Sequence, residues 1–199
     1  MKKITALITL STLLTACASH KPTPPIETYS LPSTTLTQTA TLSKQDNVIR
    51  MMPATIAPQF SNAAFIYRVS SVQYLTDPYR QFLTAPNIEI SSYLENHLAV
   101  SPKMMLISSD NLTPANFVLQ ENITELYADY QNKLAPEAVL SIQFILYHCD
   151  NGVMKQVGTT TLSEKTSIKP NDPTSLLAGY QSNLDKMTKK LSQWINLKK

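Results

Sequence analysis

The cysteine at position 17 is the residue whose surroundings point most directly to a chemical reaction. It follows an apolar run from Ile4 to Leu14 and the small residues Thr15 and Ala16, and Lys2 and Lys3 precede the apolar run. The apolar run is too short to span a bilayer. A charged start, a short apolar run and small residues before a cut are typical of a secretory signal. We therefore expect residues 1–16 to be removed, which leaves Cys17 at the new N-terminus.

The ending Leu14-Thr15-Ala16-Cys17 resembles a bacterial lipobox, in which the cysteine thiol receives a diacylglyceryl group. The alternatives are an ordinary signal with a chance cysteine and a buried first helix. Ala18 and Ser19 follow, without the aspartate that resembles an inner-membrane retention signal. Each buried methylene of an acyl chain contributes about 0.8 kcal/mol, so three chains anchor a protein essentially permanently. We therefore expect lipidated Cys17 to hold the protein on the outer membrane, facing the periplasm.

The rest of the chain contains little that could carry catalysis or hold a metal. Its three glycines do not cluster and no G-x-S-x-G motif occurs, so phosphate-binding loops and a serine hydrolase elbow are excluded. His148 and Cys149 are adjacent on a predicted strand, where successive side chains point to opposite faces. Glu121, Glu125 and Asp129 alternate along another predicted strand, and we interpret them as a solvated face. We expect no enzyme activity, no cofactor and no metal site.

One segment has the residue types of a binding surface. Residues 74–83 bring Tyr74, Tyr79, Arg80 and Phe82 into what reads as a short connection. Aromatic residues and arginine are enriched at the centres of protein interfaces. The alternative is that these aromatics merely plug one end of the sheet. We take the four residues as the candidate partner-binding site.

Composition agrees with an exported protein that does not bind nucleic acid. Of the 17 basic residues, Lys2 and Lys3 belong to the predicted signal, which leaves 15 against 14 acidic residues. No stripe of Lys and Arg interleaved with aromatics accompanies this even balance. Beyond Cys17 the only cysteine is Cys149, so a lipidated Cys17 leaves no intramolecular disulfide. The fold must then be held by its core, for which about 150 residues suffice in one domain.

The chain divides into a tether and one domain. Residues 17–45 form a tether rich in Pro, Thr and Ser, and a flexible stretch of that length has a reach of about 30 Å. The exception is Tyr29-Ser30-Leu31, a strand-like island that could dock on the folded part. Residues 46–199 are expected to form a single domain.

The periodicity of this domain predicts an α+β fold. Apolar residues recur every four positions after Pro86, at Ile90, Leu94 and Leu98, which predicts a short helix. Asp172 and Pro173 are a good N-cap and first residue for a long C-terminal helix. Asp150-Asn151-Gly152 is a strong hairpin signal. Strands are predicted at residues 48–52, 63–69, 104–107, 117–130, 138–148 and 153–168. We expect a mostly antiparallel sheet with the two helices on one face.

The order of these motifs resembles a known family. The acylated cysteine is followed by Tyr29-x-Leu31, Tyr67-Arg68, Tyr74 and Asp77, then Tyr79-Arg80-x-Phe82-Leu83-x-x-Pro86 and a helix. Further on come Phe117-Val118-Leu119, Leu126 to Tyr130 and the closing long helix. This pattern is similar to the ABC-type transport auxiliary lipoproteins, the PqiC-like family. The chain departs from it where many relatives carry a tryptophan beside the aromatic–proline segment.

The resemblance implies a role in transport between membranes. Such lipoproteins are accessory parts of Mce systems, which move phospholipid or other hydrophobic cargo. The implied partner is an MCE-domain, PqiB-like protein that reaches outward from the inner membrane, and the lipoprotein could also assemble with copies of itself. Two other hypotheses stay open: a periplasmic lipid carrier with an acyl-sized cavity, and a hydrolase.

Overall fold

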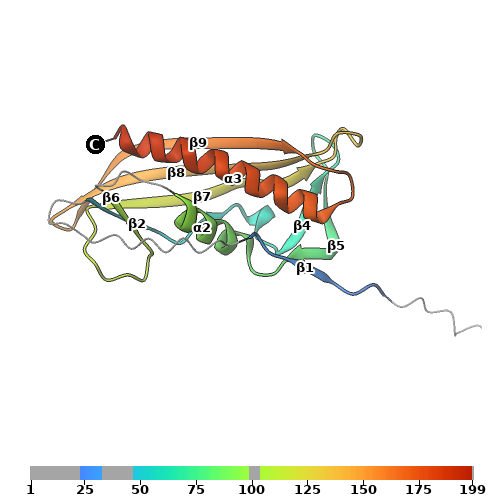
Figure 1. The fold of residues 1–199 in the computed structure, drawn as a ribbon, viewed down its shortest axis with the longest axis horizontal. Coiled ribbons are helices and arrows are strands. Elements are labelled where there is room, and N and C mark those ends of the chain that lie inside the picture. The colour runs from blue at the N-terminus through green and yellow to red at the C-terminus, as the bar shows by residue number, and fades with distance from the viewer. Residues whose placement is uncertain (1–22, 33–46, 99–103, 199) are drawn as a thin grey trace, which may run out of the picture.

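The computed structural model describes residues 23–32, 47–98 and 104–198, so Cys17, the predicted signal peptide and most of the predicted tether lie outside it. Within these ranges, one nine-stranded sheet has helices α2 and α3 on a single face, with α3 laid across it (Figure 1). The predicted α+β class is confirmed. The strands are β1 Glu27–Tyr29, β2 Asn47–Met51, β3 Thr55–Ile56, β4 Ala64–Arg68, β5 Tyr74–Phe82, β6 Met104–Ile107, β7 Phe117–Asp129, β8 Glu137–Asp150 and β9 Val153–Ser167. The helices are α2 Pro86–His97, α3 Pro173–Asn196 and the short 3-10 helix η1 Pro58–Phe60.

The three longest strands form an antiparallel meander along one side of the sheet. β7 pairs with β8 from Phe117 opposite His148 to Asp129 opposite Glu137, and β8 pairs with β9 over nearly its whole length. Alternate β8 residues face the helices and are almost fully buried, as the sequence predicts: Leu140, Ile142, Phe144 and Leu146. The meander is therefore the floor on which the core is built.

The β8–β9 hairpin closes at the predicted turn. Asn151 and Gly152 both have positive φ, 48° and 79°. A two-residue turn with both central residues in the left-handed region matches the right-handed twist of the flanking strands. Glycine reaches this region without a steric cost, and asparagine tolerates it better than most residues.

The shorter strands pair largely in parallel. β2 is parallel to both β6 and β7, β4 is parallel to β7, and β1 is parallel to β5, whereas β4 and β5 are antiparallel. β1 ends at Tyr29, the first residue of the predicted strand-like island, so the strand lies two residues earlier than predicted and contributes an edge strand from within the predicted tether. Leu31 beyond it is buried and donates its backbone N–H to Glu89 Oε2 of α2 at 2.7 Å. Docking of the island on the domain is confirmed.

Both helices begin where the sequence predicts. α2 starts at Pro86, whose missing N–H needs no partner in a first turn, and Glu89 lies in that turn. α3 starts at Pro173, and Asp172 caps it by accepting a hydrogen bond from the Ser175 backbone N–H at 3.0 Å. The buried stripe of α3 recurs at helical spacing: Leu176, Tyr180, Leu184, Met187, Leu191 and Ile195.

Helix α3 approaches the sheet most closely at Gly179. A Cβ at this position would lie 2.7 Å from Ala138 Cβ and 2.8 Å from Ile168 Cγ2, which is closer than carbon atoms can pack. One turn later, buried Asn183 donates to the Ala138 carbonyl at 2.9 Å and accepts from the Thr166 hydroxyl at 2.7 Å. These contacts seat α3 on β8 and β9.

We expect the Gly152→Val variant to be less stable than the wild type by on the order of 1–2 kcal/mol. A Cβ at this position would meet no described atom within 4 Å, so the loss would come from the positive φ rather than from a clash. Urea denaturation followed by Trp194 fluorescence measures the difference. Gly152→Asn is the control and should lose less. Equal stability of the Val variant and the wild type would contradict the turn geometry.

Candidate functional site

The predicted binding segment is a strand rather than a connection, which corrects the sequence interpretation. Residues 74–82 form β5, between β4 and β1. Phe82 is 3% exposed and packs against Phe65 and Tyr180, with ring centroids 5.0 and 6.2 Å apart. Phe82 therefore belongs to the core and cannot be offered to a partner. Phe82 thus agrees with the alternative interpretation given above, in which the aromatic residues fill one end of the sheet.

The other three predicted residues are divided between the two faces of β5. Glu27 and Arg80 are register partners, as are Tyr29 and Phe82, so alternation turns Tyr79 away from the face of Arg80. Tyr79 is 40% exposed. Tyr74 is 44% exposed at the start of the strand. These residues are close together in the sequence, but the pleat of the strand turns their side chains to different faces of the sheet.

Tyr74 joins an aromatic cluster with Phe60 and Tyr127. Its ring meets the Phe60 and Tyr127 rings edge-on, with centroids 6.2 and 5.5 Å apart. The guanidinium of Arg68 lies over the Tyr127 ring, 4.7 Å from its centroid, and forms an ion pair with Asp129. This packing holds Tyr74 in place while nearly half of its surface stays accessible.

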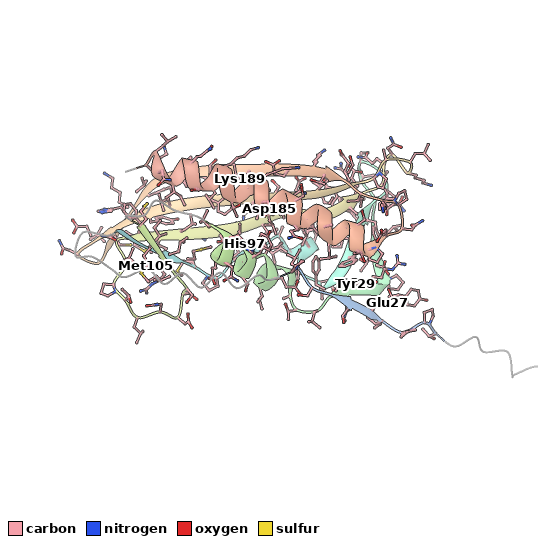
Figure 2. The ribbon with its side chains drawn as sticks, in the orientation of Figure 1. Glu27, Tyr29, His97, Met105, Asp185 and Lys189 are labelled. Atoms are coloured by element: carbon pink, nitrogen blue, oxygen red, sulfur yellow. The ribbon has the colours of Figure 1, made fainter. Side chains whose placement is uncertain are left out.

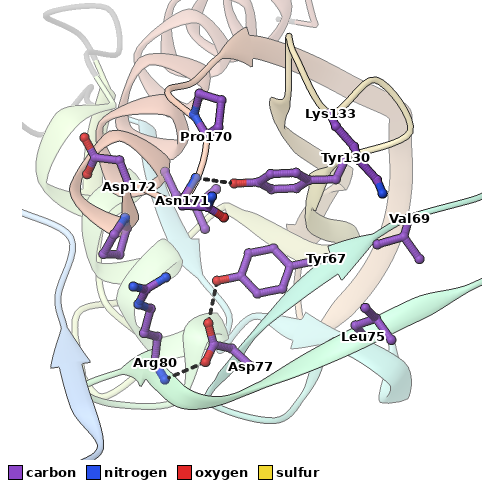
Figure 3. Close-up of a pocket in the computed structure, with 12 residues that line it drawn as sticks. Tyr67, Val69, Leu75, Asp77, Arg80, Tyr130, Lys133, Pro170, Asn171 and Asp172 are labelled. Carbon is purple, nitrogen blue, oxygen red and sulfur yellow. Dashed lines mark hydrogen bonds between the residues drawn. The ribbon is translucent and has the colours of Figure 1, made fainter. Parts of the chain in front are cut away.

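Arg80 lies on the wall of a pocket of about 340 Å³ (Figure 3). The pocket lies where β4 and β5 meet the start of α3 and the segment that follows β7. Its lining combines tyrosines, charged groups and small apolar residues: Tyr67, Val69, Leu75, Asp77, Arg80, Tyr130, Lys133, Pro170, Asn171, Asp172, Pro173 and Leu176. Tyr74 and Tyr79 do not line it.

Asp77 organises the β5 wall of this pocket. Its Oδ2 accepts the Tyr67 hydroxyl at 2.6 Å, and its Oδ1 accepts the backbone N–H groups of Tyr79 at 2.9 Å and Arg80 at 3.0 Å. The β4–β5 register is irregular between Ala64 and Ile66, opposite this part of β5. Burial, together with the hydrogen bond to Asp77, raises the pKa of the Tyr67 hydroxyl. It therefore remains a neutral donor near pH 7.

The acidic groups of the pocket are occupied internally, whereas its cations are more open. Asp77 has the three donors described above, and Asp172 caps α3. Arg80 has its Nε 3.7 Å from Glu27 Oε2, a distant and half-exposed pair. Tyr130, which also lines the pocket, is fixed in position because its hydroxyl accepts a hydrogen bond from the Asn171 backbone N–H at 3.0 Å. The pocket can therefore recognise a polar or anionic group by hydrogen bonds and charge.

Two carboxylates interpreted as part of a solvated face are in fact buried. Glu121 is fully buried on the helix-facing side of β7, and Asp129 is 9% exposed and paired with Arg68. Glu125 remains half-buried. The signal for Glu121 is its alternation with Phe117, Leu119 and Ile123, which places a carboxylate in an apolar row. The prediction of a solvent-exposed face is wrong because it considers only the charged residues and not the apolar residues that alternate with Glu121.

Other groups that could hold ligands stay apart. Among the described residues, no three or more His, Cys, Asp and Glu side chains come together as a metal site. The His148 ring meets the Phe117 ring at 5.1 Å, and Cys149 is a half-buried free thiol. No helix in the described part of the chain is long and apolar enough to cross a membrane.

Known structures share this architecture at low sequence identity. No family model matches the chain, and no curated protein matches it. It is similar in structure to protein XCC0632 from Xanthomonas campestris, assigned to the DUF330 family, with TM-score 0.67, 12% identity, and 88% of this chain and 93% of that chain covered. A second, uncharacterised protein gives TM-score 0.67 at 12% identity, over 86% of this chain and 99% of that chain. The hypothetical protein CT253 from Chlamydia trachomatis gives TM-score 0.50 at 16% identity, over 74% and 96% of the two chains. These likenesses establish the fold.

We expect Asp77→Ala to destabilise the domain by on the order of 2 kcal/mol, because it removes a charged acceptor from three donors at once. Urea denaturation monitored by circular dichroism measures the change. Asp77→Asn keeps an oxygen for the backbone donors and should lose less. If Ala and Asn variants are both as stable as the wild type, Asp77 does not organise the pocket wall.

Proposed function

We propose that the chain is an outer-membrane lipoprotein that serves as an accessory subunit of an Mce/ABC-type system for intermembrane transport of lipid or another hydrophobic compound. Lipidated Cys17 would anchor it, and β5 would dock an MCE-domain partner. The support is the lipobox-like ending, the resemblance to the PqiC-like lipoproteins and the exposed surface of β5. The role is one of binding rather than catalysis.

The observation that carries the docking surface is the exposure of Tyr79 beside Arg80. Tyr79 is 40% exposed although it is a large aromatic residue. The next residue, Arg80, lines the pocket. Tyrosine and arginine are, with tryptophan, the residue types enriched among the anchors of protein interfaces. β1 pairs only with Arg80 to Phe82, so a partner that binds β5 beyond the end of β1 would contact Tyr79 on one face and reach Arg80 on the other.

The position of β1 supports a docking surface close to the proposed anchor. Nine residues separate Cys17 from Glu27, where the sheet begins. Fully extended, such a segment reaches at most about 35 Å. β1 pairs with β5, so the docking surface would lie at the membrane-proximal end of the domain. A partner that starts at the inner membrane would have to extend to the outer membrane for its tip to contact this surface.

The lipid-carrier hypothesis finds less support in this pocket. About 340 Å³ lies at the low end for a ligand site, and charged and tyrosine side chains take up much of the lining. An acyl chain needs a longer apolar enclosure. We therefore favour docking over carriage as the role of this end of the domain.

The mature protein should begin at Cys17 and carry acyl chains, because the charged start, short apolar run and small residues lead directly to that cysteine. Mass spectrometry of the membrane-extracted protein checks the mass of the N-terminal peptide. Cys17→Ser should abolish the modification and release the protein from the membrane fraction. An unmodified N-terminus at another residue would contradict the anchor.

Replacing Tyr79 and Arg80 with alanine should weaken partner binding by about thirtyfold or more, since truncated interface anchors commonly cost roughly 2 kcal/mol. Pull-down with the MCE-domain partner measures binding, and sedimentation follows self-association. The matched control is Met154→Ala with Lys155→Ala, an exposed apolar–basic pair on the β8–β9 hairpin.

Circular dichroism must show that both double variants fold. A folded Tyr79/Arg80 variant that binds as well as the wild type would contradict the docking surface. An equal loss of partner binding in the Met154/Lys155 control would show that the weakened binding is not specific to β5.

A further inference from the structure

Glu121 is an isolated carboxyl group inside the hydrophobic core. It lies on the helix-facing side of β7 between Leu119 and Ile123, and all three residues are 0% exposed. Neither of its side-chain oxygens has a partner at ordinary hydrogen-bond geometry among the described residues, and the Ser91 hydroxyl is the one neutral donor that acts on it. Buried polar groups in proteins are nearly always hydrogen-bonded, so this carboxyl group calls for a physical explanation.

Its surroundings favour the neutral acid. Burial and, to a smaller extent, repulsion by Glu95 raise the pKa of Glu121 to about 8, although a hydrogen bond with the Ser91 hydroxyl acts in the opposite direction. Burial and Asp110 in turn raise the pKa of Glu95. Removing an ionised carboxylate from water without a partner costs far more than burying the protonated form. Glu121 is therefore mainly protonated in the folded state near pH 7.

The described elements packed around Glu121 bring no cation to it. α2 contributes Ser91 and the acidic Glu95. The neighbouring strands contribute apolar groups: Phe144 of β8 is its register partner, and buried Met51 of β2 pairs with the adjacent Leu119. α3 contributes Asp185 (Figure 2). Its carboxylate accepts a hydrogen bond from the Tyr93 hydroxyl of α2 at 2.7 Å. Each charged group named here is an acid.

Helix α2 is the element that covers Glu121. A cleft of about 170 Å³ runs beside this helix, and Ser91 and Glu95 line it together with Pro53 and Ala54. The same two α2 residues thus border both the buried carboxyl group and an opening to solvent. Side-chain hydrogen bonds tie the helix to its surroundings on either side of Ser91. Before it, Asn87 donates to the Ala54 carbonyl at 3.0 Å and Glu89 accepts from the Leu31 backbone N–H at 2.7 Å, and after it Tyr93 donates to Asp185.

We propose that Glu121 is a proton-linked latch: its protonated side chain lets α2 lie on the sheet, and loss of the proton loosens α2 so that the carboxylate can reach water through the cleft. The folded-state pKa lies above the ordinary value of 4.5. By linkage, the stabilisation is therefore fully present below about pH 4.5 and is lost as the pH rises through about 8.

Loosening α2 would have a defined structural result. The face that α2 turns to the core contains Ile90 and Leu94, which are 1% and 0% exposed. When α2 moves, this apolar face and the sheet beneath it become accessible together. This inference does not depend on the proposed transport role or on the lipid anchor.

Amide hydrogen exchange of the folded protein, corrected for the intrinsic effect of pH, tests the latch. In the wild type, protection of the α2 amides should fall about tenfold between pH 7 and 9, in step with ionisation of a group whose pKa is near 8. Glu121→Gln has nearly the same shape and no proton to lose, so its protection should stay constant over this range. Glu125→Gln, on the opposite face of β7, is the matched control and should behave like the wild type.

A second measurement keeps the test decisive if the Gln variant does not fold. The carbon-13 shift of the Glu121 carboxyl group in the wild type reports its protonation directly. A midpoint above about pH 7, with α2 protection falling at the same pH, supports the latch. A midpoint below about pH 7, or an equal loss of α2 protection in wild type and Glu121→Gln, overturns it.

Discussion

The close seating of α3 on β8 is the contact on which the other surfaces depend. At Gly179 the helix lies so near Ala138 and Ile168 that a single added carbon would not fit. This approach fixes the start of α3, and Asp172 there forms one side of the pocket. It also fixes Asp185, which holds α2 through Tyr93. The pocket and the helix that covers Glu121, although they lie in different parts of the fold, are thus positioned by one element.

Strand β5 shows how one short segment can serve several purposes. Its last residue, Phe82, is part of the core, whereas Tyr74 and Tyr79 are partly exposed and Arg80 borders the pocket. The pleat of the strand imposes this division, and Asp77 stabilises the irregular backbone in its middle. Proximity in sequence therefore indicates the right neighbourhood for a binding surface, but not the direction of each side chain.

The features that could be predicted from sequence are those encoded by neighbours along the chain. The β8–β9 hairpin has its own turn at Asn151 and Gly152, and α3 has its own cap at Asp172, so both are predicted with nearly correct bounds. Parallel pairing of β2 with β6 and β7 leaves no local signal, because the partners are joined by long segments. The pocket escapes prediction for the same reason: it brings together residues from β4, β5 and the start of α3. Glu121 could have been found, since it interrupts an otherwise apolar row.

The buried amide of Asn183 gives the helix a single permitted position along the sheet. An apolar stripe alone would let α3 slide by one turn, because leucine and methionine can replace one another in a core with modest loss. Sliding would withdraw the amide from the Ala138 carbonyl and the Thr166 hydroxyl and leave buried polar groups unsatisfied. It would also bring a residue with a Cβ to the place that only Gly179 fits. Many sequences could hold a helix on this sheet, but the glycine and the amide together also specify where along the sheet it stops.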